Sequence, residues 1–265
     1  MPGIGYFLAS GRVTNPGAAL TAVTVNTGDS LQIPSFDRTQ PAYLEQAWAH
    51  EATVGVLRIR SPKLHDNVQG IRLSVPETQA KPLLPDEADQ PVVTLDTLTV
   101  ELSGGGAETD VAVLAFYLQA MDGANQQLAS WDQVKPRIMN LLTNEVDCTA
   151  PVTIGNWSPG NTLTNNFDQL HITSKYAVLG YEVSAACAAI AISGPDTTQL
   201  KVGGPGTTDS RVTRDWFVRQ SLQTGRPHIP VLNPANKGAT LVFTLSASAP
   251  AAINVGLVLA ELSGS

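Results

Sequence analysis

Charged residues are scarce in this 265-residue chain, and basic residues are scarcer than acidic ones. Asp, Glu, Lys and Arg make up 15% of the residues, whereas an average globular protein has about 25%. The net charge is −7, and the densest basic segment holds Arg58, Arg60 and Lys63. Because affinity for nucleic acid depends on basic clusters that neutralise phosphates, direct nucleic-acid binding is not expected. A surface poor in charge instead favours contacts between subunits.

Cysteines and long apolar runs are also few. Cys148 and Cys187 are the two cysteines, which is too few for a disulfide framework or a cysteine-based metal site. No run of the sequence approaches the roughly 18 apolar residues of a membrane span. The segment Met1–Gly5 lacks the basic start and apolar core of a secretion signal. We therefore expect no transmembrane segment, and a protein that is made in a cytoplasm and stays soluble until it assembles.

Residue patterns typical of catalysis are missing. The histidines are His50, His65, His171 and His228, and none has a second His, Cys or Asp at metal-ligand spacing. No Gly-x-Ser-x-Gly segment is present, although a triad assembled from distant residues leaves no such mark in a sequence. A structural or surface role is favoured for each histidine. The sequence predicts no catalytic, cofactor-binding or metal-binding residues, and no enzyme.

Two further segments have both a chemical and a structural interpretation. Gly203-Gly204-Pro205-Gly206 is rich in glycine but lacks the Lys-Ser/Thr end of a phosphate-binding loop, so a turn is predicted there. Asp86, Glu87 and Asp89 offer carboxylates for Ca²⁺, but a solvated acidic loop is the stronger interpretation.

The chain contains a repeat. Thr97–Ser103 aligns without gaps to Thr240–Ser246, and after a short turn Asp110–Leu118 aligns to Asn254–Leu262. Weaker matches precede these in the same order along the chain. We interpret the pattern as an internal duplication of a unit of about a hundred residues. The alternative is that hairpins made of Thr, Val and Leu resemble one another by chance.

The repeated segments have the composition of β-strands. Leu98, Val100 and Leu102 alternate with Thr99 and Glu101, which predicts a strand with one apolar face. The turns that follow the aligned strands are predicted at 103–106 and 247–250. Further strands are predicted at 20–26, 43–60, 71–75, 152–157, 176–192 and 228–232.

Helices are expected in two places. Residues 210–224 lie between a cap at Asp209 or Ser210 and a stop at Gly225, with Trp216, Phe217 and Leu222 on the buried side. A weaker helix is predicted between Trp131 and Asn144, with Pro136 in its first turn.

Together these features predict an all-β protein made of two tandem antiparallel β-sandwiches with a few short helices in loops. The first sandwich covers residues 1–125, a linker with a short helix covers 126–150, and the second sandwich covers 151–265. A jelly roll is the first candidate for each sandwich and an immunoglobulin-like fold is the second.

In this architecture the chain resembles the double jelly-roll major capsid proteins of tailless, membrane-containing bacteriophages and of adenovirus. The resemblance covers nearly the whole chain and rests on the duplicated unit and on a helix in a long loop late in one half. The segment from Trp216 to Pro234 is similar to the helix-to-strand connection of a viral shell protein. No residue signature specific to that family is present, and the chain lies near the small end of its size range.

The resemblance implies a virion protein that is made in the host cytoplasm and self-assembles through homotrimeric capsomers. Its partners are then copies of itself and other virion proteins. A single-jelly-roll capsid protein, a tail component, a virion decoration protein and a receptor- or carbohydrate-binding module are alternatives. An enzyme on a β-sandwich, such as a cupin or a glycan lyase, is a third class, which the dispersed histidines disfavour.

Overall fold

The computed structural model describes residues 3–14, 17–25, 42–50, 55–61, 68–74, 81–82, 91–92, 98–104, 109–121, 126–163, 170–246 and 251–264. Within these residues the chain forms four antiparallel sheets and a few short helices. The predicted all-β class, with sandwiches and short helices in loops, is confirmed.

The first half of the chain forms two sheets. Sheet 1A has the order β3-β1-β10-β4-β7, with β8 also paired to β4, and sheet 1B has the order β2-β9-β5-β6. The strand bounds are β1 (Gly3–Thr14), β2 (Thr21–Ala22), β3 (Thr24–Val25), β4 (Ala42–His50), β5 (Val56–Arg60), β6 (Ile71–Ser74), β7 (Lys81–Pro82), β8 (Pro91–Val92), β9 (Thr99–Ser103) and β10 (Thr109–Met121).

The second half also forms two sheets. Sheet 2A has the order β11-β17-β14-β19-β12, and sheet 2B has the order β13-β18-β15-β16. The strand bounds are β11 (Leu128–Ala129), β12 (Ile138–Cys148), β13 (Asn161–Thr162), β14 (Lys175–Val183), β15 (Cys187–Ser193), β16 (Val202–Gly206), β17 (Ile229–Leu232), β18 (Leu241–Leu245) and β19 (Ile253–Leu262).

The strand orders of the two halves correspond. Sheet 1A contains β1-β10-β4-β7 where sheet 2A contains β12-β19-β14-β17, and sheet 1B contains β2-β9-β5-β6 where sheet 2B contains β13-β18-β15-β16. If β3, β8 and β11 are left out, each half has eight strands that can be numbered 1 to 8 along the chain. In both halves one sheet then has the strand order 1-8-3-6 and the other has the order 2-7-4-5. The aligned repeat segments fall on β9 and β10 in one half and on β18 and β19 in the other.

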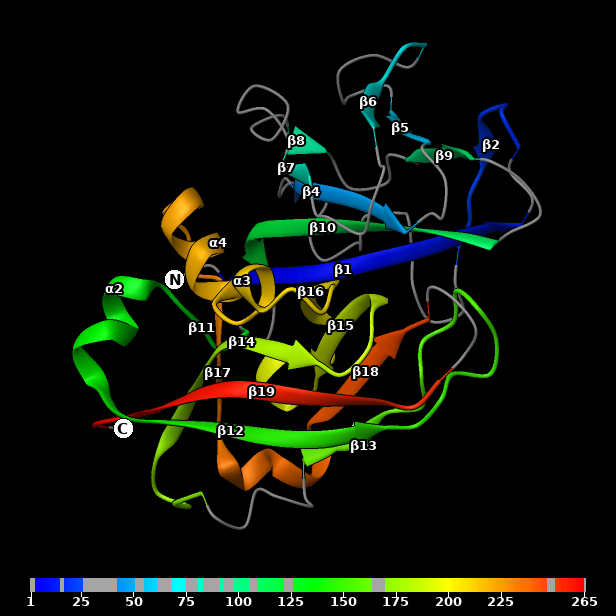
Figure 1. The fold of residues 1–265 in the computed structure, drawn as a ribbon. Coiled ribbons are helices and arrows are strands. Elements are labelled where there is room, and N and C mark those ends of the chain that lie inside the picture. The colour runs from blue at the N-terminus through cyan, green and yellow to red at the C-terminus, as the bar shows by residue number, and fades with distance from the viewer. Residues whose placement is uncertain are drawn as a thin grey trace.

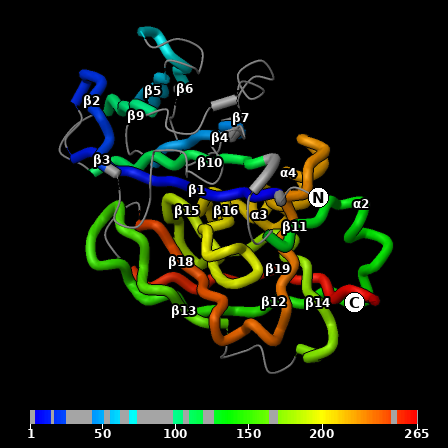
Figure 2. The backbone as a smooth tube through the Cα atoms, turned by 180° about the vertical axis from the view of Figure 1, so that it is seen from behind, coloured from blue at the N-terminus to red at the C-terminus, as the bar shows by residue number. Residues whose placement is uncertain are grey.

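The four sheets lie as layers in the order 1B, 1A, 2B, 2A (Figures 1 and 2). Strand β1 contacts β16, and both β10 and β4 contact β15, so sheet 1A packs against sheet 2B. On β10, Ala112, Leu114 and Phe116 face the core of the first half, whereas Val111 and Val113 belong to the core of the second. Strand β10 is therefore buried on both faces, which explains its almost uninterrupted apolar sequence.

The helix predicted at 210–224 is present as α3 (Ser210–Thr213) and α4 (Trp216–Thr224). The side chain of Asp209 accepts a hydrogen bond from the backbone N–H of Arg211, as expected of a helix cap. Gly225 ends α4 with a φ of 67°, a left-handed conformation that favours glycine. Trp216 and Phe217 are buried as predicted, but Leu222 is 58% exposed, so its predicted burial is wrong.

The second predicted helix is shorter than expected. Helix α2 (Trp131–Val134) is followed by a 3₁₀ turn (Lys135–Arg137), and then β12 begins at Ile138. Residues 142–148 alternate between inward and exposed side chains with the period of a strand, and this period outweighs the helix pattern. Because β12 pairs with β19 along its length, it belongs to sheet 2A and not to a linker.

Other predictions have mixed outcomes. The strands predicted at 20–26, 43–60, 71–75, 176–192 and 228–232 are present, and those at 20–26, 43–60 and 176–192 each appear as two strands. Residues 152–157 form turns and one bridge to Leu245, so the strand predicted there is wrong. Gly203–Gly206 is part of β16, so the turn predicted there is wrong too. The turn at 247–250, residues 105–106 of the turn at 103–106 and the acidic residues Asp86, Glu87 and Asp89 lie outside the described residues.

Candidate functional site

A buried ionic cluster joins the two halves. Glu45, on β4, accepts a hydrogen bond from Arg226 Nη1 at 2.7 Å through Oε1, and its Oε2 lies 2.7 Å from His228 Nε2. The side chains of Glu45 and His228 are 4% and 0% exposed. Arg226 and His228 lie between α4 and β17, more than 180 positions further along the chain. The fold therefore places one carboxylate of the first half between two basic side chains of the second.

The protonation of Glu45 follows from these contacts. Burial alone raises the pKa of a carboxyl group, because it penalises the charged form. The hydrogen bonds and charges of His228 and Arg226 outweigh burial at Glu45, and its pKa lies below the ordinary value of 4.5. The carboxylate is ionised at neutral pH, and its charge is compensated within the cluster.

Tyrosine rings enclose the cluster. His228 stacks on Tyr117 and meets Tyr6 edge-on, each with ring centroids 5.2 Å apart. The guanidinium of Arg226 lies 5.1 Å from the ring centroids of Tyr43 and of Tyr117, within cation–π distance. Burial and then the charge of Glu45 raise the pKa of Tyr6 well above 10 and that of Tyr117 to about 12. These phenols are neutral and act as packing groups.

The hydroxyl of Thr224 gives the cluster a superficial likeness to a catalytic triad. Thr224 Oγ1 lies 3.3 Å from His228 Nδ1, and the other ring nitrogen faces Glu45. However, the hydroxyl donates its proton to the carbonyl of Gln220 at 2.8 Å, and Nδ1 also faces the carbonyl of Arg226 at 3.2 Å. The imidazole has no exposed surface from which to reach a substrate, which suits a structural role better than that of a general base.

Further hydrogen bonds cross the same junction. Trp48 donates from Nε1 to the carbonyl of Ala188 at 2.8 Å. The side chain of Gln126 accepts from the backbone N–H of Tyr6 at 2.7 Å and donates to its carbonyl at 3.0 Å. Near the C-terminal end of β1, the side chain of Arg12 donates to the carbonyl of Ile154 at 3.1 Å. The contacts extend along β1 and β4, so the halves are held at several points and not by a single hinge.

The three histidines that the structure describes are not gathered at one site. His228 is in the ionic cluster, His171 is exposed, and His65 lies outside the described residues. His50 is partly buried, and burial lowers its pKa. Among the described residues, no three His, Cys, Asp or Glu side chains are grouped so that they could hold a metal ion. In that same part of the chain, no helix is both long and apolar enough to span a bilayer.

Both cysteines are free and buried. Burial raises the pKa of Cys148 and of Cys187 to about 12, so neither is a thiolate at neutral pH. Cys187 packs as a small apolar side chain, because its residue exposure is 1%.

The ionic cluster could not be predicted from the sequence, although one residue pointed to it. Glu45 interrupts a strand in which Leu44, Ala47 and Trp48 are fully buried. A carboxylate in such a strand requires a buried partner, because an unpaired buried charge is costly. The sequence alone could not identify that partner, because Arg226 and His228 are brought to Glu45 only by the stacking of the halves.

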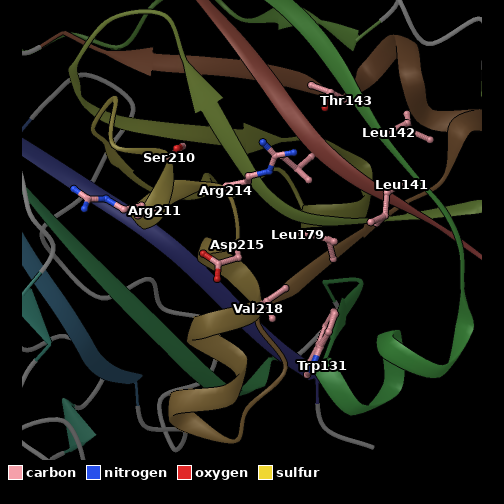
Figure 3. A pocket seen from close by; sticks show the side chains of 11 residues that line it. Trp131, Leu141, Leu142, Thr143, Leu179, Ser210, Arg211, Arg214, Asp215 and Val218 are labelled. Carbon is pink, nitrogen blue, oxygen red and sulfur yellow. The ribbon is translucent and has the colours of Figure 1, made fainter.

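An apolar groove of about 700 Å³ lies at sheet 2A (Figure 3). Leu179, Val218 and Val258 contribute apolar side chains, and Trp131 of α2 stands at one end. Arg211, Arg214 and Asp215 supply its polar side, and Leu141 of β12, which is 60% exposed, lies along its edge.

Comparisons with known proteins are sparse. No family model and no curated protein matches the chain. Among solved structures, it is similar to the crystal structure of PBSX exported protein XepA, at 11% identity over 94% of this chain and 86% of that chain, with a TM-score of 0.19. A TM-score this low carries no argument about fold or function.

Proposed function

We propose that this chain is a structural shell subunit of a virion, a capsid protein that works by assembling with copies of itself. In this proposal each half is a jelly roll, the halves arose by internal duplication, and three chains form a capsomer. The virus is a bacteriophage, the protein acts in the virion, and other virion proteins are further partners. The role is structural and not enzymatic.

The shared strand order of the two halves carries the proposal. A jelly roll winds eight strands through two Greek keys into two packed sheets, and viral capsid domains are among the proteins that use it. Both halves have eight corresponding strands in two four-stranded arrangements. A fold alone does not define a function. Two further properties of this chain therefore support the proposed shell role.

The first property is rigidity. The buried cluster at Glu45 and the two-faced strand β10 hold the halves as one block, which suits a building unit that must present fixed surfaces. The second property is a surface with few charges, because charged residues make up 15% of the chain. Contacts between such surfaces require less desolvation of charge, and closed symmetry uses each contact many times.

Assembly of the purified protein tests the proposal. Light scattering at micromolar concentration is expected to show trimers and larger species, and electron micrographs are expected to show capsomers or shells. A monodisperse monomer across this concentration range would contradict the proposed role.

The groove at sheet 2A favours one alternative, a decoration or receptor-binding module that holds a small ligand such as a sugar. Its volume of about 700 Å³ lies within the range of ligand sites, and Trp131 offers an aromatic ring at its edge. A glycan array separates the two functions. Binding that is lost in Trp131→Ala, from a protein that stays monomeric, supports the alternative.

A further inference from the structure

The outer face of sheet 1B carries an unbalanced group of charges. Arg72 of β6, Arg58 of β5 and Glu101 of β9 are consecutive partners across three strands, because Arg58 pairs with Arg72 on one side and with Glu101 on the other. Arg60, two residues along β5 from Arg58, also reaches Glu101. Among the residues of this face that the structure describes there are thus three guanidiniums and one carboxylate, and we call these four residues the arginine face.

Glu101, the one carboxylate among the described residues of this face, is engaged by both arginines of β5. Arg60 Nη2 lies 2.9 Å from Glu101 Oε1, and Arg58 Nε binds Oε2. The Glu101 side chain is 10% exposed beneath the two guanidiniums. Burial raises the pKa of Glu101, but its hydrogen bonds with Arg58 and Arg60 lower it by more. Glu101 therefore stays ionised and has little capacity left for a third cation.

Arg72 is left beside a like charge. Its residue is exposed, and it makes no ion pair with any residue that the structure describes. Directly opposed like charges on neighbouring strands are destabilising. The pairing of Arg58 with Arg72 therefore places two positive charges side by side. A carboxylate from another molecule would reduce the repulsion between them.

The face also has the position and setting of a contact surface. Sheet 1B is an outermost layer of the stack, as Figure 1 shows. Its side chains stand on paired strands, so their positions are set before any partner arrives. The chain as a whole has a net charge of −7, so the surface of another copy is acidic on balance and complements this local excess of positive charge.

We propose that the arginine face docks carboxylates of a second copy of this chain and forms one of the contacts through which copies assemble. This inference rests on the proposed self-assembly and identifies one surface through which the copies would make contact. A polyphosphate such as nucleic acid is the less favourable occupant, because the overall negative charge of the chain repels it and three arginines form a small footprint.

Charge reversal tests the contact. Arg72→Glu is expected to raise the protein concentration required for assembly about tenfold, because an attractive contact becomes a repulsive one. Lys135→Glu makes the same change in net charge at an exposed residue after α2 and is expected to assemble like wild type. Circular dichroism checks that both variants fold, and Arg72→Ala, with an intermediate effect, provides a milder second variant.

Cross-linking identifies the partner. Arg72→Lys keeps the positive charge and supplies an amine that a carbodiimide couples to a touching carboxylate, with loss of water. In mixed ¹⁴N- and ¹⁵N-labelled protein, the expected product is an intermolecular link from position 72 to an Asp or Glu of the other copy. Links confined to one chain would overturn the inference.

The remaining outcomes separate this inference from the proposed function. Wild-type assembly that Arg72→Glu leaves unchanged overturns the contact but not the shell role. A wild type that never assembles overturns both. Binding of duplex DNA that is lost in Arg72→Glu, with assembly unaffected, assigns the face to nucleic acid and also overturns the inference.

Discussion

Glu45 illustrates how one charged side chain stabilises a β-rich interior through its partners. Removing one member of a buried ionic group leaves the other charges without compensation and costs about 3 kcal/mol or more. We expect Glu45→Ala to lower the free energy of unfolding by about 3 kcal/mol in urea denaturation, because Arg226 and His228 lose their common carboxylate.

A surface pair provides the control for this substitution. Glu182 pairs with Arg214 at 3.0 Å, but its side chain is 41% exposed. Glu182→Ala is expected to cost less than about 1 kcal/mol, because water and salt screen exposed pairs. Equal costs at the two sites would contradict the assignment of Glu45 as a clamp between the halves.

The lowered pKa of Glu45 also predicts a dependence on pH. A carboxyl group whose pKa is lowered by folding stabilises the protein above its unfolded pKa, and this contribution is lost as the pH falls through the folded pKa. For Glu45 the loss is therefore expected below pH 4.5, its ordinary pKa. Denaturation curves of wild type and Glu45→Gln, measured from pH 7 downwards, should converge as the acid removes this contribution. A constant difference across that range would argue against it.

At the scale of elements, β16 shows how closely neighbouring strands of one sheet are packed. A Cβ atom added at Gly203 would lie 1.8 Å from the carbonyl oxygen of Ile190 on the neighbouring strand. Gly203→Ala must therefore displace β16 from β15, and we expect a loss of about 3 kcal/mol in the free energy of unfolding.

Gly238→Ala is the matched control, because a Cβ there meets no atom within 4 Å. Thermal denaturation is expected to leave that variant within about 0.5 kcal/mol of wild type. If Gly203→Ala were equally mild, the close pairing of β15 with β16 would be wrong.

The same strand shows what local patterns can and cannot predict. The helix at α3 and α4 was predictable, because its cap at Asp209 and its stop at Gly225 are local signals. Gly203–Gly206 has the composition of a turn but lies in β16. The glycine at position 204 is required there because Tyr181 and Trp216 occupy the space that a side chain would need. Strand β1 was not predicted either, because both of its faces are apolar: Tyr6 and Leu8 belong to the core of the second half, and Phe7 belongs to the core of the first.

At the scale of the molecule, the two-faced burial of β10 predicts cooperative unfolding. Val111 and Val113 lose their contacts if the second half unfolds, and Ala112 and Leu114 lose theirs if the first half unfolds. We expect a single calorimetric transition in which the measured and van't Hoff enthalpies agree. Two resolved transitions would show that the halves are energetically independent.

The all-β class and the two sandwiches could be predicted from the chain, because alternation and turn residues are local properties. The order of the strands, the stacking of sheet 1A on sheet 2B and the cluster at Glu45 could not. They depend on pairs such as Trp48 with Ala188, which lie 140 positions apart and have no mark in either local sequence.

The layer order has a consequence for synthesis in the cell. The ribosome releases β1, β4 and β10 before it has translated residues 187–206, which supply the strands that cover them. Until then the nascent chain exposes an apolar sheet surface, and such surfaces on incomplete chains attract chaperones or aggregate. The rate at which a cell completes each polypeptide therefore helps to set its yield of usable protein.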